Sequence, residues 1–299
     1  MAGLRERGDS TCSAVDTRVL GSYAAGQQMG TDGRSGTPHA LKRPGAAEMQ
    51  AMFDRHGFVP SPQCPPRLLE AHKSLVYFIL RAFASDVRVV AGMLAAVVEW
   101  YRRYDELAGA QPTELELQYS DKKVRLRLAC SAGCNHCCTS LVSVIGPEAV
   151  LIAEYIKATF TPAHRASLDA RIDAHAQTMA EGLAAGPRPT QMCPLNVDGK
   201  CSVYAVRPFN CRKWHSFDEP ACRQAFIGGD RTVVIPRANV RADSSGLVWQ
   251  SVVAAFSARG VDCAELDLLP ALKTALATER VAGRFVAGEP IFAAARRGK

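Results

Sequence analysis

The stretch "CSAGCNHCC", residues 130–138, places four of the chain's eleven cysteines within nine positions. The four are Cys130, Cys134, Cys137 and Cys138. Thiols this close together can form a disulfide framework, the buried face of a helix, or one arm of a metal site. The fold depends on which of these is correct, because a metal site would tie this stretch to other cysteines further along the chain.

A second group of cysteines lies in "CPLNVDGKCSVYAVRPFNCRKWHSFDEPAC", residues 193–222. Its members are Cys193, Cys201, Cys211 and Cys222. The sequence "DGKC" predicts a turn that delivers Cys201, and "RPFNC" predicts another before Cys211. Three basic residues flank Cys211, namely Arg207, Arg212 and Lys213. Their positive charge would lower the pKa of nearby thiols and offset thiolate charge, whereas the alternative is an ordinary solvated loop.

The spacing of the first arm favours metal binding. A gap of two residues lets one turn deliver the thiolates of Cys134 and Cys137 to a single tetrahedral ion, and Cys130 is close enough to add a third. The side chain of Cys138 diverges from that of its neighbour, so one simple mononuclear site does not account for the doublet. Two metals, a polynuclear cluster or one spare thiol would account for it. Eight cysteines suit two four-cysteine sites or one cluster with a remainder, and the sequence does not choose.

Two other interpretations of the first arm remain open. Positions 130, 134, 137 and 138 lie on one face of a helix, so they could be mere packing, although Gly133 and Asn135 make a poor helix interior. The histidines inside the arms, His136 and His215, could each replace a thiolate. The commoner outcome for a loop histidine is to face solvent.

The remaining sequence predicts a mainly α fold, a helical domain with an irregular Cys-rich metal-binding module and a short β-hairpin before it. Helical spacing begins at Pro65, and a second helix is expected from Asp86 to about Leu107. Alternation in "TELELQYSDKKVRLRLA", residues 113–129, predicts the hairpin. Later helices are expected from Pro147, from Pro162, over residues 244–260 and over residues 266–277.

These elements divide the chain into four segments. They are a flexible N-terminal lead (1–47), a helical segment (48–112), the Cys-rich metal-binding module with inserted helices (113–230), and a C-terminal helical segment (231–299). Outside the two arms, Cys12, Cys64 and Cys263 stand alone. We expect Cys263 to be a small core residue.

The charge and hydropathy of the sequence limit which binding partners and which cellular compartment we expect. The formal net charge is +7, but it is spread along the chain without a dense Lys/Arg run, so we do not expect a nucleic-acid partner. The N-terminus lacks the apolar core of a secretion signal, and Arg81, Asp86 and Arg88 interrupt the most apolar region. We therefore expect a cytoplasmic protein without a membrane span, in which clustered thiols stay reduced and bind metal.

The cysteine pattern resembles the CxxCxxCC family of zinc- or iron-chelating domains, the YkgJ-type cysteine-cluster proteins. The resemblance covers residues 128–225 and includes the Cys137–Cys138 doublet, Glu148, Tyr204 and "RPFNCR". One departure is the three-residue gap between Cys130 and Cys134, where the family pattern has two. The resemblance implies a metal-binding module with zinc or iron, and it implies no reaction. Flagellin lysine N-methylases look similar in this pattern, but the chain has no glycine-rich strand-to-helix turn for a methyl donor.

The sequence therefore predicts a protein that binds zinc or iron, or an iron–sulfur cluster, through both arms. The expected ligands are Cys134, Cys137, Cys193, Cys201 and Cys211, followed by Cys130, Cys138 and Cys222. A metal- or thiol-dependent enzyme, redox or methyltransferase-associated, is one alternative, with Cys138 as its reactive thiol. A structural zinc module for protein or nucleic-acid interaction is another. No catalytic residue, substrate or protein partner can be named.

Overall fold

The computed structural model describes residues 87–109, 113–119, 122–131, 133–185, 190–230, 232–257 and 259–297. This part of the chain is mostly helical, as the sequence predicted, with a few short strands. The predicted N-terminal lead and the helix expected from Pro65 lie outside the described residues.

Eight α-helices form in the described residues. They are α4 (Val90–Gly109), α5 (Gly146–Thr159), α6 (Pro162–Ala185), α7 (Phe209–Arg212), α8 (Glu219–Cys222), α9 (Asn239–Ser257), α10 (Leu268–Ala277) and α11 (Val281–Val286). Tighter or wider single turns are η2 (His136–Thr139), η3 (Tyr204–Val206), η4 (Arg223–Ile227) and η5 (Ala293–Ala295). The strands pair two by two, antiparallel: β1 (Glu114–Tyr119) with β2 (Lys122–Arg127), β3 (Ser143–Val144) with β6 (Leu266–Asp267), and β4 (Asn196–Val197) with β5 (Lys200–Cys201).

The first part of helix α5 lies in the hydrophobic core. Its first eight residues are buried on every side, which fits a helix whose sequence "GPEAVLIA" is apolar all round apart from Glu148. It packs against α4, α10 and α11. A side chain at Gly146 would overlap the ring of Phe285 on α11, so glycine is what allows these two helices to approach so closely.

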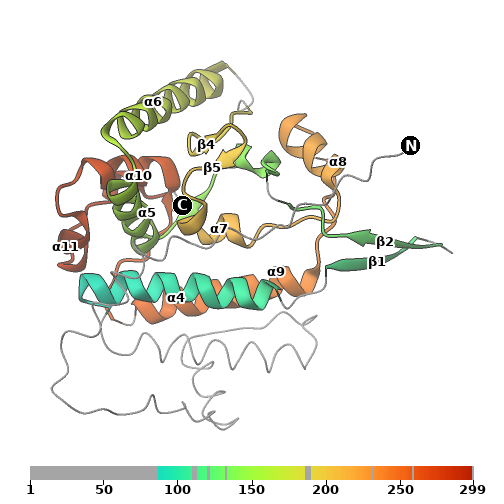
Figure 1. The fold of residues 1–299 in the computed structure, drawn as a ribbon, viewed down its shortest axis with the longest axis horizontal. Coiled ribbons are helices and arrows are strands. Elements are labelled where there is room, and N and C mark those ends of the chain that lie inside the picture. The colour runs from blue at the N-terminus through green and yellow to red at the C-terminus, as the bar shows by residue number, and fades with distance from the viewer. Residues whose placement is uncertain are drawn as a thin grey trace, which may run out of the picture.

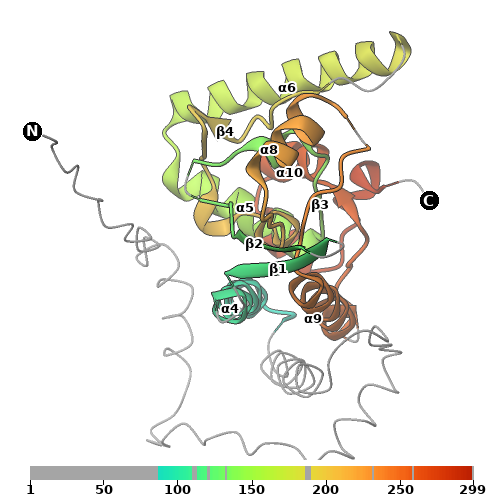
Figure 2. The same cartoon turned by 90° about the vertical axis from the view of Figure 1, so that its right-hand side faces the viewer.

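Three of the other helices form two outer layers (Figures 1 and 2). Helices α4 and α9 lie side by side along one side of the molecule, and α6 lies on the opposite side (Figures 1 and 2). Strand β5 and helix α7, which carry Cys201 and Cys211, lie between these layers (Figure 1). One hydrophobic core runs through the described residues from Val87 to Ala295. Strand β5 and helix α7 therefore lie between helices that come before and after them in the chain (Figure 1).

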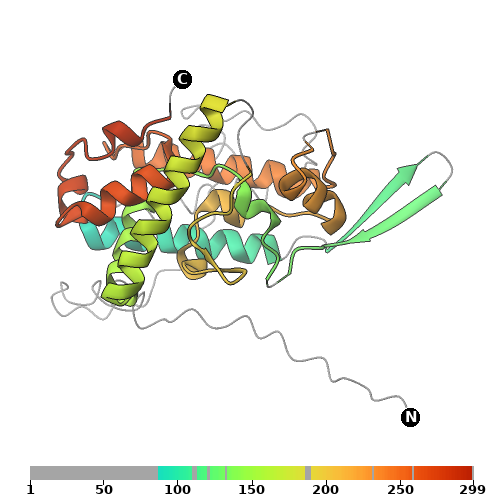
Figure 3. The same ribbon diagram turned by 90° about the horizontal axis from the view of Figure 1, so that it is seen from above.

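The β1–β2 hairpin projects from the helical body (Figure 3). On one face it carries exposed ion pairs, in which Glu116 bonds Lys123 at 3.0 Å and Arg125 at 3.4 Å. Exposed pairs of this kind add little to stability. None of the helices in the described ranges is long and apolar enough to cross a lipid bilayer.

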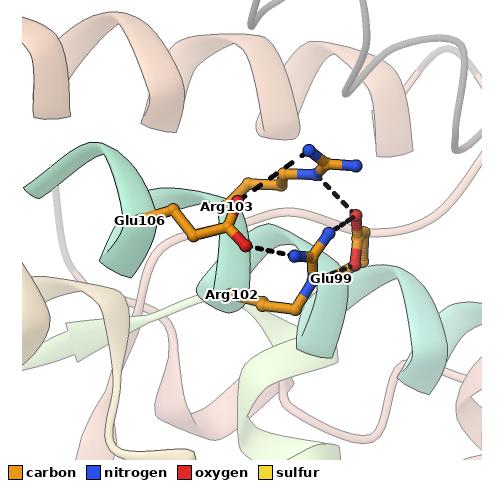
Figure 4. Close-up of polar contacts among 4 residues, drawn as sticks. All are labelled: Glu99, Arg102, Arg103 and Glu106. Carbon is orange, nitrogen blue, oxygen red and sulfur yellow. Dashed lines mark hydrogen bonds and ion pairs between the residues drawn. The ribbon is translucent and has the colours of Figure 1, made fainter. Parts of the chain in front are cut away.

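Helix α4 turns a charged face to solvent. Arg102 pairs with Glu99 at 2.6 Å and with Glu106, and Arg103 pairs with Glu99 at 2.7 Å (Figure 4). These side chains form ion pairs with one another at i,i+3 and i,i+4 spacing. This is the usual arrangement on a solvent-exposed helix face, and no ligand is needed to explain it.

Candidate metal centre

The first arm is not an α-helix. Gly133 has a φ of +89°, in the left-handed region that favours glycine, and only residues 136–139 form a helical turn, η2. The interpretation of Cys130, Cys134, Cys137 and Cys138 as one helix face is therefore wrong. No disulfide forms among the nine cysteines of the described residues.

The turn before Cys201 confirms the sequence prediction. Asp198 and Gly199 have φ values of 50° and 78°, which is the backbone of a two-residue hairpin turn with both central residues left-handed. The turn joins β4 to β5 and places Cys201 directly opposite Asn196. Cys211 lies in the single turn of α7, and Cys222 is the last residue of α8.

The two arms meet at Cys138 and Cys193. The backbone N–H of Cys193 donates to the carbonyl oxygen of Cys138 at 2.8 Å. The side-chain amide of Asn196 donates to the Cys138 Sγ at 3.6 Å. The thiol of Cys211 interacts electrostatically with those of Cys138, Cys193 and Cys201, and Cys137 with that of Cys211. We call these five residues the thiol cluster: Cys137, Cys138, Cys193, Cys201 and Cys211.

The remaining predicted ligands lie around the thiol cluster. Cys130 is exposed and lies within electrostatic range of Cys137. Cys222 is buried and lies within electrostatic range of Cys134. Burial raises the pKa of Cys263 to about 12, with Asp262 and Glu148 as its charged neighbours, as expected for a core thiol outside the arms. The structure thus sets five predicted ligands within electrostatic range of one another, with Cys130, Cys134 and Cys222 around them.

Most thiols of the cluster are held neutral. Burial raises the pKa of Cys193 to about 12 and also raises the pKa values of Cys201 and Cys211. The hydrogen bond between Cys137 and Cys138 raises the pKa of Cys137 and lowers that of Cys138 to about 6, with help from Asn196. A bound divalent cation reverses such shifts, because it stabilises the thiolate directly.

Two arginines accompany the thiol cluster. The charges of Arg207 and Arg212 both act to lower the pKa of Cys201, against the larger effect of burial. The Arg207 guanidinium lies 3.8 Å from the centre of the Tyr204 ring. Its buried Nε–H has no hydrogen-bond partner among the described residues. A donor left over beside thiols fits an anionic thiolate site, because thiolates accept the hydrogen bonds that neutral thiols accept only weakly.

The two histidines of the arms differ in what they could bind. His215 is 2% exposed, its Nδ1 lies 3.1 Å from the Lys213 carbonyl oxygen, and its Nε2 accepts from the backbone N–H of Ala238 at 3.1 Å. Both ring nitrogens are engaged, so His215 fits a structural role. The Nε2 of His136 lies 2.5 Å from a carboxylate oxygen of Glu219, so only its Nδ1 could face a metal.

The thiols do not stand in finished metal-binding geometry. In the described part of the chain, no three His, Cys, Asp or Glu side chains are grouped so as to hold a metal ion. Binding would therefore require the cysteine side chains to turn toward a common point. The donor set itself, thiolate with adjacent positive charge, fits zinc, iron or an iron–sulfur cluster better than magnesium or calcium.

The way in which the second arm is fastened to the core is not evident from the sequence. Glu148 stands in the first turn of α5, but it also bonds Tyr101 and the backbone of Phe209. The available signal was one carboxylate within an otherwise apolar helix. A buried charge of this kind needs partners, although their identity cannot be read from the sequence.

Comparison with known proteins gives no further guide, since no protein-family model, no curated protein and no solved structure matches this chain.

Proposed function

We propose that this protein binds a transition metal, zinc or iron, through the thiol cluster, and that residues 113–230 act as a Cys-rich metal-binding module. The observation that supports the proposal is the meeting of Cys137 and Cys138 with Cys193, Cys201 and Cys211, from a segment more than fifty residues away. The resemblance of residues 128–225 to the CxxCxxCC family points the same way. A reducing compartment such as the cytoplasm would keep these thiols available.

The cluster offers more thiols than one ion needs. Cys193, Cys201 and Cys211 with one member of the doublet would complete a tetrahedral four-cysteine site. The other member, together with Cys130, Cys134 and Cys222, would then supply a second ion or a larger cluster. Zinc would contribute folding energy and iron would add redox chemistry.

Metal content is the direct test. The protein, purified without oxygen, should contain zinc or iron at one or more ions per chain. Iron with matching acid-labile sulfide and a brown colour would assign an iron–sulfur cluster, whereas a colourless protein with zinc would assign a chelating or structural site. A folded protein that holds no metal and takes up none after reduction would refute the proposal.

Cysteine variants locate the site. Cys201→Ala and Cys211→Ala should each lose most of the bound metal, because each removes a thiol from the cluster. Cys263→Ala is the matched control, since it removes a partly buried thiol outside the arms. Equal metal content in all three variants would contradict the assignment of the site to the thiol cluster.

A second candidate function follows from Cys138. Its pKa of about 6 and its two hydrogen-bond donors are those of a reactive thiolate, which suits a thiol-dependent enzyme. In metal-free protein at pH 7, a small amount of iodoacetamide should then label Cys138 before any other cysteine. Labelling spread evenly over the arms would remove this candidate.

A further inference from the structure

A buried carboxylate fastens three segments together beside Cys211. Glu148 on α5 is fully buried. One carboxylate oxygen accepts from the Tyr101 hydroxyl on α4 at 2.6 Å and from the backbone N–H of Phe209 on α7 at 2.7 Å. The other accepts from the backbone N–H of Ile145 at 3.1 Å. Helices α4, α5 and α7 thus meet on one side chain.

Arg212 completes this network from the other end of α7. Its side chain is 5% exposed and donates to Asp105 on α4 at 2.5 Å. It also donates to the backbone carbonyls of Arg207 at 3.0 Å and Ala205 at 2.5 Å. Its guanidinium lies 4.2 Å from the centre of the Tyr101 ring. Arg212 therefore closes the loop between Cys201 and Cys211 and ties it to α4.

Only one of the bonds to Glu148 stabilises α5, the helix that carries this carboxylate. The bond from Ile145 caps the start of α5, as an acid in the first turn commonly does. The bonds from Tyr101 and Phe209 belong to other segments. Helix α7 has only four residues, too few to be stable by itself, so its position depends on contacts such as these.

We propose that Tyr101, Glu148 and Arg212 are positioning residues of the metal centre, which set Cys201 and Cys211 against the first arm. The proposal rests on the proposed function, metal binding by the thiol cluster. Cys211 is the third residue of α7, so a shift of this short helix moves its thiol directly. Groups that orient metal ligands in this way change affinity when they are removed, even though they never touch the metal.

Two substitutions and a matched control test the proposal. Tyr101→Phe deletes one donor to Glu148 and keeps the ring beneath Arg212. Glu148→Gln removes the charge and one acceptor. Lys157→Met acts at the opposite end of α5, where the Lys157 ammonium donates to the carbonyls of Ala275 and Thr278 at 3.1 and 3.0 Å.

The first measurement is Co²⁺ binding to the reduced, metal-free full chain, followed by the sulfur-to-cobalt charge-transfer absorption. We expect about 10- to 100-fold weaker binding and an altered absorption band for Tyr101→Phe and Glu148→Gln. We expect a lower melting temperature but unchanged affinity and spectrum for Lys157→Met. If Tyr101→Phe lowers the melting temperature and binds Co²⁺ as the unmodified protein does, the network is structural only and the proposal is overturned.

The second measurement does not depend on metal. Iodoacetamide labelling of the metal-free proteins, followed by peptide mass spectrometry, gives the reactivity of Cys201 and Cys211 relative to Cys263. Tyr101→Phe should raise this ratio several-fold, and an unchanged ratio overturns the proposal. If the unmodified protein binds neither Co²⁺ nor Zn²⁺, the proposed function fails, and this ratio still decides whether the network positions the two cysteines. Tyr101→Phe suffices for both measurements if Glu148→Gln does not fold.

Discussion

At the scale of single residues, two arginines of the same arm serve different purposes. The Arg212 guanidinium is fully engaged with a carboxylate and two backbone carbonyls. The Nε–H of Arg207 is buried without a partner among the described residues, although burial without a hydrogen bond is unfavourable. Arg207 therefore has the properties expected of a residue whose Nε–H finds a hydrogen-bond acceptor when nearby thiols become thiolates.

Replacing Arg207 should affect metal binding more than folding. We expect Arg207→Met to weaken Zn²⁺ binding about tenfold, as for other groups that support metal ligands. The stability of the metal-free protein should change by no more than about 1 kcal/mol, the value of the lost stacking on Tyr204. Chelator competition and urea unfolding give the two quantities. Arg284→Met, which removes an exposed arginine paired with Glu289, controls for the loss of charge. Equal Zn²⁺ affinity in both variants would contradict this role.

The buried thiols predict how stability depends on pH. Burial raises the folded-state pKa of Cys193 to about 12 and also raises those of Cys201 and Cys211 above the value of about 8.5 for an unfolded thiol. The stability that comes from a raised pKa is complete below the unfolded pKa and is lost as pH rises toward the folded pKa. The melting temperature of the metal-free protein should therefore fall above pH 8.5.

The metal-loaded protein provides the comparison for this pH effect. Its cluster thiols are already deprotonated by the ion, so they add no loss of stability in the same range. Cys263 titrates in both forms, so the difference between the two melting curves isolates the thiol cluster. Parallel curves for the two forms from pH 7 to 10 would show that the metal does not bind there.

At the scale of elements, what could be predicted from the sequence was local. Hydrophobic periodicity and turn-forming residues predicted helices α4, α5, α6 and α10 and the β1–β2 hairpin. The sequence "DGKC" predicted the turn before Cys201. Helix α9 begins at Asn239, five residues before the predicted start, and the six-residue α11 is too short to show a period.

Contacts between distant segments could not be predicted in this way. Strands β3 and β6 have two residues each and pair across more than a hundred positions. The bonds that Glu148 accepts from Tyr101 and Phe209 cross 47 and 61 positions. Such contacts follow from how helices stack in space, and hydrophobic periodicity reports only which side of each helix is buried. The sequence therefore predicted candidate ligands without the groups that orient them.

The close approach of α5 and α11 predicts a large effect from a single methyl group. Gly146→Ala would place its Cβ against the buried Phe285 ring, and such overpacking costs about 1–3 kcal/mol. Gly283→Ala, on α11 itself, would meet no atom within 4 Å and should be neutral or stabilising by up to about 1 kcal/mol. Urea unfolding of the two variants gives both values. Equal stability of Gly146→Ala and Gly283→Ala would mean that α5 and α11 are not closely packed at Gly146.

At the scale of the whole molecule, helices α5 and α6 lie between the two arms along the chain. A metal bound by residues of both arms would close that loop and restrain the helices within it, so part of the binding free energy becomes folding free energy. We expect a chelator to lower the melting temperature, corresponding to about 4 kcal/mol when free metal had been a thousandfold above its dissociation constant. Complete removal of metal with no change in melting temperature would disprove the restraint.

The burial of the first eight residues of α5 also limits where the cysteines can function. Two of the helices that cover it, α4 and α10, lie before residue 128 and after residue 225, outside the stretch that carries the two arms. If residues 128–225 were transferred to another protein, the apolar helix α5 would lack α4, α10 and α11, the helices against which it packs. The cysteine pattern is therefore not a portable unit in this chain, and a host protein would have to supply the missing helices before the thiols could meet.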